Sequence, residues 1–185
     1  FEPYIINAKA LGARTIAIPS DADFAFPLAK VLAAISPNTR LIFINTPHNP
    51  SATVWSRAEL QQLADLLQGT SVLVIADEVY EHMVFDGARH ESVARHAELA
   101  QRSVVVSSFG KTYHVTGWKI GYAAAPAALM AEFRKVHQFN VFTVNTPMQH
   151  GLASYLKDPM NYEGVYSFYD AKRDRFLIGL HAARC

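Results

Sequence analysis

Two lysines, Lys111 and Lys119, lie in the polar stretch SSFGKTYHVTGWK at 107–119, directly after an apolar segment. A lysine amine becomes a nucleophile when burial or a nearby cation makes its ammonium easier to deprotonate. Lys119, eight positions after Lys111, could supply that cation or bind an anion. The Gly-Lys-Thr triplet is not a Walker phosphate loop, because Val105 stands where that motif requires glycine. Taken alone, the triplet also fits a lysine that simply begins a helix or loop.

Three further polar residues follow strand-like segments. Asp77 ends an apolar run, where a carboxylate is costly to bury unless a cation or hydrogen-bond donor meets it. Tyr80 comes three residues later, so on a helical turn it points to the same side as Asp77. Asn49 lies in the turn Pro-His-Asn-Pro. The ordinary alternatives are a helix cap for Asp77 and turn chemistry for Asn49.

Together, these residue types predict a pyridoxal phosphate site. That cofactor requires a lysine for its Schiff base, a carboxylate for its pyridine nitrogen, and hydrogen-bond donors for its phenolate oxygen. It also requires hydroxyl or cationic groups around its phosphate. Lys111 would form the Schiff base, and Ser108 with Lys119 would bracket the phosphate.

The elements that must position these residues alternate along the chain. Segments rich in β-branched residues predict strands at 14–18, 40–46, 71–77, 103–108 and 119–125. Helical patterns fall at 56–68, 127–138, 145–156 and 162–184, the first with a Ser-x-x-Glu capping box. This alternation predicts an α/β fold, a three-layer sandwich with a mostly parallel sheet. Ligands bind beyond the carboxyl ends of such strands, where three of the polar clusters fall.

Composition narrows the classes of function. Of 185 residues, 50% are hydrophobic and 18% charged, with a formal net charge of +1, which is typical of one globular domain. No block of like charge suggests a nucleic-acid partner, and no apolar run is long enough to span a membrane. The single cysteine, Cys185, excludes a disulfide framework, and the histidines lack metal-ligand spacing, so we expect no metal.

The stretches NTPHNPSATV, DEVYEHMVF and SSFGKTYHVTGWKIGY, in that order, resemble signature blocks of the class I/II aminotransferases, which are fold-type-I pyridoxal phosphate enzymes. Within the family, the chain is most similar to bacterial methionine aminotransferases and the related kynurenine aminotransferase branch. The resemblance covers nearly the whole chain. It implies a cytoplasmic homodimer that transfers an amino group between an amino acid, methionine or aromatic, and a 2-oxo acid.

The resemblance also implies a role for each polar residue. Lys111 matches the Schiff-base lysine, which moves the substrate α-proton, and Asp77 matches the partner of the pyridinium nitrogen. Tyr80 and Asn49 match the groups that bind the phenolate oxygen, with Asn49 also facing the substrate carboxylate.

Three further positions complete the implied cofactor site. Ser108 and Lys119 match phosphate ligands, and Phe1 aligns with the aromatic residue that stacks on the pyridine ring. Many relatives have arginine in place of Lys119, although the kynurenine branch often keeps lysine. The family's common Asn-Pro-Thr-Gly turn reads Asn-Pro-Ser-Ala at 49–52. Because alanine adopts a positive φ less readily than glycine, we expect a different turn type there.

Residues 1–185 are therefore expected to form a partial large domain that binds the cofactor. The family's N-terminal segment and its C-terminal small domain would lie outside this chain. Two alternatives stay open: a β-lyase that eliminates rather than transaminates, and a non-catalytic fragment or cofactor-binding module. Cofactor chemistry does not separate transamination from elimination, because the outcome depends on which substrate bond stands perpendicular to the ring.

Overall fold

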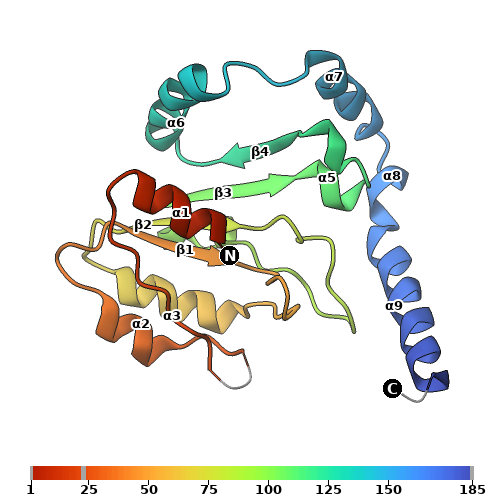
Figure 1. Cartoon of the computed structure of the whole chain (residues 1–185), viewed down its shortest axis with the longest axis horizontal. Helices are drawn as coiled ribbons and strands as arrows, with labels where there is room; N and C mark the ends of the chain where they lie inside the picture. Colours follow the sequence, from red (N-terminus) through yellow and green to blue (C-terminus); the bar gives the residue numbers. More distant parts are fainter. Residues whose placement is uncertain (1, 22–23, 184–185) are drawn as a thin grey trace. The chain divides into compact units, whose positions relative to one another are not determined.

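The computed structural model describes residues 2–21 and 24–183, in two compact units that divide between residues 39 and 40 (Figure 1). The first unit contains α1 (Glu2–Ala10) and α2 (Leu28–Ala34). Its described part contains no strand, so the predicted strand at 14–18 is wrong. That segment has β-branched residues but pairs with no other strand, and strand propensity without a partner does not make a sheet.

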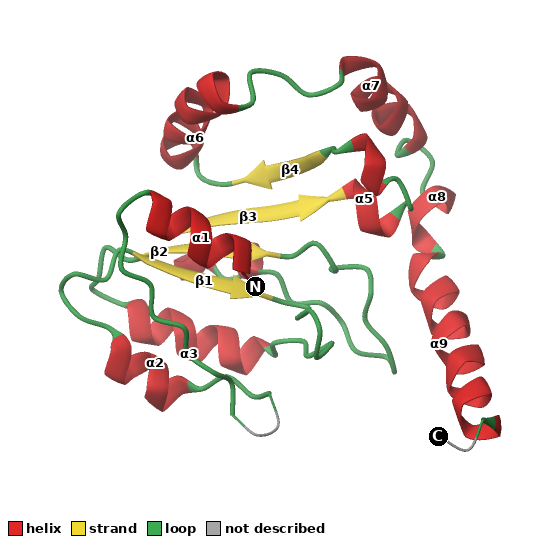
Figure 2. Ribbon diagram, in the orientation of Figure 1, coloured by secondary structure: helices red, strands yellow, loops and turns green. Residues whose placement is uncertain are grey.

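The second unit is built on a sheet whose described strands have the order β1-β2-β3-β4 (Figure 2). These strands are β1 (Leu41–Asn45), β2 (Leu73–Asp77), β3 (Ser103–Ser108) and β4 (Gly121–Ala124). The pairs β1–β2 and β2–β3 are parallel, whereas β4 runs antiparallel to β3. Four of the predicted strands are thus confirmed, as is an α/β fold with a mostly parallel sheet.

Helix α3 (Arg57–Leu67) crosses from β1 to β2 and begins with the predicted capping box. The hydroxyl of Ser56 accepts the backbone N–H of Glu59 at 3.2 Å, and the Glu59 carboxylate accepts the Ser56 N–H at 2.7 Å. Leu60, Leu63 and Leu67 are fully buried on one face of the helix. The reciprocal cap and this apolar face explain why the helix forms where the sequence predicts it.

Short helical turns join the remaining strands. They are η1 (Val93–Arg95) and α4 (Ala97–Ala100) before β3, and α5 (Phe109–Thr112) and η2 (Thr116–Trp118) before β4. Arg102, at the start of β3, donates through Nη1 to the carbonyl oxygens of Leu67, Thr70 and Val72 at 3.0–3.1 Å. This guanidinium therefore joins the end of α3 and the loop before β2 to the start of β3.

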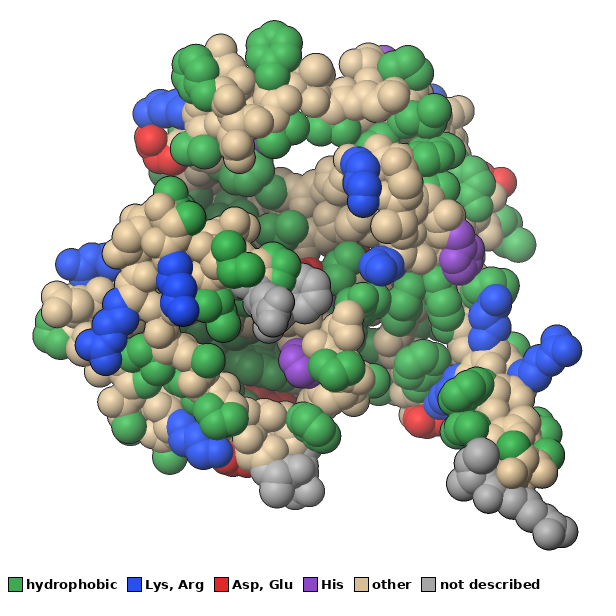
Figure 3. All heavy atoms as spheres, viewed as in Figure 1, with side chains coloured by type: hydrophobic (Ala, Val, Ile, Leu, Met, Phe, Trp, Pro, Cys, Tyr) green, Lys and Arg blue, Asp and Glu red, His purple; other side chains and the backbone are tan. Residues whose placement is uncertain are grey.

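The chain continues through α6 (Ala127–Asn140), α7 (Thr146–Tyr155), α8 (Met160–Glu163) and α9 (Val165–Ala182). The long helix predicted at 162–184 is in fact interrupted, with Gly164 separating α8 from α9. Hydrophobic side chains reach the surface in this region: Phe139 is 88% and Phe142 76% exposed, and Figure 3 shows hydrophobic atoms over these helices. Among the described residues, no helix is long and apolar enough to cross a membrane.

Candidate functional site

The carboxyl ends of β1, β2 and β3 meet at one edge of the sheet. Asn45 is in register with Asp77, and Asp77 with Val106. Because successive side chains in a strand alternate between faces, Asn45, Asp77 and Ser108 share one face of this edge. The polar clusters after these three strands are therefore brought together, as the sequence predicts.

Hydrogen bonds join the loop after β1 to the loop after β2. The amide of Asn49 donates from Nδ2 to the Tyr80 hydroxyl oxygen at 3.1 Å. The backbone N–H of Asn49 donates to Asn45 Oδ1 at 3.1 Å, and Asn45 Nδ2 donates to the Asp77 carbonyl oxygen at 2.9 Å. Asn45 was not predicted as part of the site, yet its side chain bridges Asn49 and Asp77.

Asp77 is half-buried at the start of a pair of tight turns. Its Oδ1 accepts the backbone N–H of Val79 at 3.1 Å, which is an Asx-type turn. The Glu81 N–H then donates to the Glu78 carbonyl at 2.9 Å, and the Met83 N–H to the Tyr80 carbonyl at 2.8 Å. Residues 79–82 form turns and no helix follows Asp77 directly, so the helix-cap alternative for Asp77 is wrong.

Lys111 lies in α5, whose start is fixed by Ser108. The Ser108 hydroxyl accepts the Gly110 N–H at 3.0 Å and donates to the Ile120 carbonyl at 3.3 Å. A Cβ atom added to Gly110 would lie 2.9 Å from the Thr116 Cα, so the turn requires glycine there. Lys111 is exposed, and within the described residues its amine has no hydrogen-bond or ion-pair partner.

Lys119 adopts the left-handed conformation, with φ of 57° at the end of η2. His114 has the same φ, so two left-handed residues bracket the segment between α5 and β4. Such angles cost a residue other than glycine about 1–2 kcal/mol, and the sequence gives no signal for them. The Lys119 amine, like that of Lys111, has no partner in the described part of the chain.

The turn at 49–52 contains a strained residue. Ala52 has φ of 59°, a left-handed conformation that alanine adopts less readily than glycine. Its N–H donates to the His48 carbonyl at 2.8 Å, and the His48 N–H donates to the Thr53 carbonyl at 2.9 Å. The His48 ring also bonds the Ser51 hydroxyl at 2.7 Å. These contacts hold the strained residue in place.

Sequence reasoning missed the polar residue buried next to Asp77. Glu78 is 1% exposed, and its carboxylate lies 2.8 Å from His90 Nε2. The available signal was its place in the strand pattern, because Val74, Ala76 and Glu78 fall on the same face. A glutamate that continues a fully buried row must find donors inside the protein.

Four tyrosines of this unit have raised pKa values. Burial, together with a 2.7 Å hydrogen bond to Glu81, raises the pKa of Tyr122 to about 12. Burial also raises the pKa of Tyr113, Tyr166 and Tyr169 above the ordinary value of 10.0.

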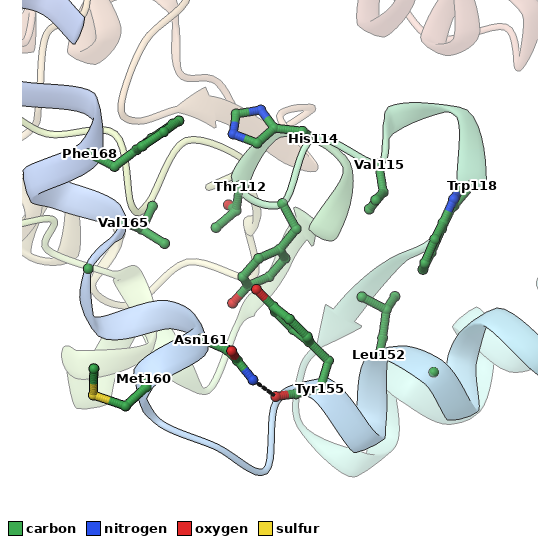
Figure 4. A pocket seen from close by; sticks show the side chains of 13 residues that line it. Thr112, His114, Val115, Trp118, Leu152, Tyr155, Met160, Asn161, Val165 and Phe168 are labelled. Carbon is green, nitrogen blue, oxygen red and sulfur yellow. Dashed lines mark hydrogen bonds between the residues drawn. The ribbon is translucent and has the colours of Figure 1, made fainter. Parts of the chain in front are cut away.

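A cavity of about 540 Å³ lies between the segment that follows α5 and helices α7, α8 and α9. Figure 4 shows His114 and Trp118 from the segment after α5 around it, together with Leu152 and Tyr155 of α7 and Phe168 of α9. Its lining is mostly apolar and includes neither Lys111 nor Asp77. The cavity is thus distinct from the polar cluster at the strand ends. Phe1, the predicted stacking residue, lies outside the described residues.

Comparison with known proteins identifies the class. Residues 1–182 match the family Aminotransferase class I and II, so the chain belongs to that family, as its motifs indicate.

Among curated relatives, methionine aminotransferase of Escherichia coli (strain K12) is 51% identical over 153 residues, which cover 82% of this chain and 40% of the relative. Kynurenine–oxoglutarate transaminase of Dictyostelium discoideum is 37% identical over 159 residues, or 83% of this chain and 37% of the relative.

A solved structure has the same fold. The structure of YbdL from Escherichia coli, for which a methionine aminotransferase function was identified, superposes with a TM-score of 0.91 at 44% identity. The match covers 98% of this chain and 48% of that one. The chain therefore spans less than half the length of the relatives that it matches.

Proposed function

We propose that the protein is a pyridoxal phosphate-dependent aminotransferase that moves the amino group of an amino acid, methionine or an aromatic one, to a 2-oxo acid. Family membership supports the reaction class, and the 51% identity to a methionine aminotransferase supports the donor. The observation that carries the proposal is the Asn49–Tyr80 hydrogen bond beside Asp77, at the same sheet edge as the strand that leads to Lys111.

The side chains present fit the cofactor. The amines of Lys111 and Lys119 have no hydrogen-bond or ion-pair partner in the described structure, so both are available to a ligand. Lys111 would hold the cofactor covalently through Nζ, and Lys119 with the Ser108 hydroxyl would bind its phosphate. When bound, pyridoxal phosphate supplies a ring that accepts electrons from the carbon next to the substrate nitrogen.

The other side chains would tune that ring. The Asp77 carboxylate would hold a proton on the pyridine nitrogen, because an adjacent negative charge stabilises the protonated form. Asn49 donates to the Tyr80 oxygen, which leaves the Tyr80 hydroxyl hydrogen available for the phenolic oxygen of the cofactor. Phe1 is proposed to stack on the ring.

Proton movement at the substrate falls to Lys111. Its Nζ would act as the general base that takes the proton from the substrate α-carbon. The proposal includes a homodimer, which sedimentation of the purified protein would test.

The experiment is to add pyridoxal phosphate to the cofactor-free protein, reduce with borohydride, and map the pyridoxyl adduct by peptide mass spectrometry. We expect one adduct, on Lys111, and transamination with methionine or an aromatic amino acid. Lys111→Arg keeps the charge and should lose both results, whereas Lys135→Arg, on exposed α6, should keep them. An adduct on another lysine, or none on the wild type, would refute the proposal.

A further inference from the structure

Each strand end that carries a candidate site residue also carries a buried polar residue on the opposite face. Thr46, Glu78 and Ser107 are 0%, 1% and 3% exposed. They are the chain neighbours of Asn45, Asp77 and Ser108, and strand alternation directs them away from the face that those residues share. Polar side chains at such positions are stable only when their hydrogen bonds are made inside the protein.

Glu78 connects the turn after β2 to the segment around residues 90–93. Its Oε2 lies 2.8 Å from His90 Nε2, and its Oε1 accepts the Ser92 hydroxyl and the Val93 N–H, each at 3.1 Å. The side chains of Glu78 and His90 are only 2% and 7% exposed. Three donors from one segment thus converge on a single buried carboxylate.

Glu81, one turn later, connects the same turn to β3 and β4. Its Oε1 accepts the hydroxyl of Ser107 at 2.9 Å and that of Tyr122 at 2.7 Å. Ser107 and Tyr122 are paired across β3 and β4. Because Ser107 precedes Ser108 in the strand that leads to Lys111, Glu81 links the two halves of the candidate site.

We propose that Glu78 and Glu81 are positioning residues: their carboxylates fix the turn that presents Asp77 and Tyr80, relative to the strand that leads to Lys111. The proposal rests on the proposed function for the roles of those three site residues. Apolar residues of similar size would fill this space without the desolvation cost of a buried carboxylate. Directional hydrogen bonds, in contrast, fix one backbone geometry.

The test begins with hydrogen exchange in the cofactor-free protein. Glu78→Gln keeps the shape of the side chain but removes its charge and turns one acceptor toward His90 into a donor. We expect the amides of Glu81 and Met83, which close the turns, to exchange faster by on the order of tenfold. The Val74 amide in β2 should keep its protection.

Glu91→Gln is the matched control. It makes the same chemical change in the same loop, but the Glu91 carboxylate faces His96 and Arg95, at 3.7 and 3.8 Å, rather than the turn. Exchange in residues 78–83 should be unchanged in this variant. Unchanged exchange in Glu78→Gln as well, or faster exchange of Val74 to the same degree, would overturn the proposal.

Ser107→Ala is the milder variant, which decides the question if Glu78→Gln fails to fold. It removes one donor to Glu81 and should speed exchange at Met83 by a few-fold, with β2 unaffected. Equal protection in Ser107→Ala and wild type would then refute the positioning role.

Pyridoxal phosphate affinity, measured by fluorescence titration, gives the second readout. Glu78→Gln should weaken it by on the order of tenfold, and Glu91→Gln should not. If Glu78→Gln speeds hydrogen exchange in residues 78–83 but leaves pyridoxal phosphate affinity unchanged, the positioning role is overturned. A wild type that fails to bind pyridoxal phosphate would refute the proposed function instead, and the exchange results would still show whether the carboxylates fix the turn.

Discussion

Replacing Ala52 with glycine should stabilise the protein, although glycine usually weakens a fold. Ala52 has φ of 59°, with its N–H bonded to the His48 carbonyl at 2.8 Å, so the chain cannot relax this angle without losing the turn. The left-handed conformation costs alanine about 1–2 kcal/mol. Glycine avoids that cost but adds about 0.4–1 kcal/mol of entropy to the unfolded chain. The difference is a gain of about 0.8 kcal/mol.

Urea unfolding, followed by circular dichroism, would measure the change as a higher midpoint at constant slope. Two control variants show in which direction a glycine–alanine exchange changes the free energy of unfolding. Gly69→Ala places a methyl group in open space at φ of 73° and should destabilise by a similar amount. Gly179→Ala, in open space in the last turn of α9, should stabilise by up to about 1 kcal/mol through helix propensity. A lower midpoint for Ala52→Gly, with both controls as expected, would refute the strain argument.

Three other changes have definite outcomes. Ser56→Ala removes the α3 capping box and should lower the free energy of unfolding by about 1 kcal/mol in the same assay. Leu63→Ala empties a fully buried site and should cost about 2–5 kcal/mol, visible as a lower Tm. The pKa of Tyr122 is raised from 10.0 to about 12, so its stabilising contribution is complete below pH 10.0 and is lost as pH rises through about 12. Tyr122→Phe should therefore lose less free energy of unfolding than the wild type as the pH rises from 10.0 to about 12.

Local sequence signals predicted the elements that depend on local chemistry. The capping box at 56–59 placed the start of α3, and apolar β-branched runs placed the strands that pair. The strand predicted at 14–18 is wrong because composition alone does not make a strand. That segment has the composition of a strand but no pairing partner in the described structure. Gly164 interrupts a helical pattern that looked continuous from residue 162 onward.

The sequence placed the candidate site residues at strand ends, but it did not predict their contacts. Strand ends and short spacing pointed to Asp77, Tyr80 and Lys111. The hydrogen bond from Asn49 to Tyr80 joins residues 31 positions apart, and no local pattern contains that pairing. The left-handed angle at Lys119 is likewise set by the turn between η2 and β4 rather than by the residue type, which disfavours it.

The adjacent pair Asp77–Glu78 shows what strand alternation adds to the reading of a site. Two consecutive carboxylates at a strand end cannot face the same way, so one is directed to the ligand face and the other into the protein. Asp77 stays half-buried and Glu78 is 1% exposed, with three internal donors. The buried member therefore constrains the backbone of the exposed one. Substituting Glu78 should therefore change the backbone position of Asp77, although Glu78 itself faces away from the ligand. A variant at position 78 can for this reason have the same effect as a variant at position 77.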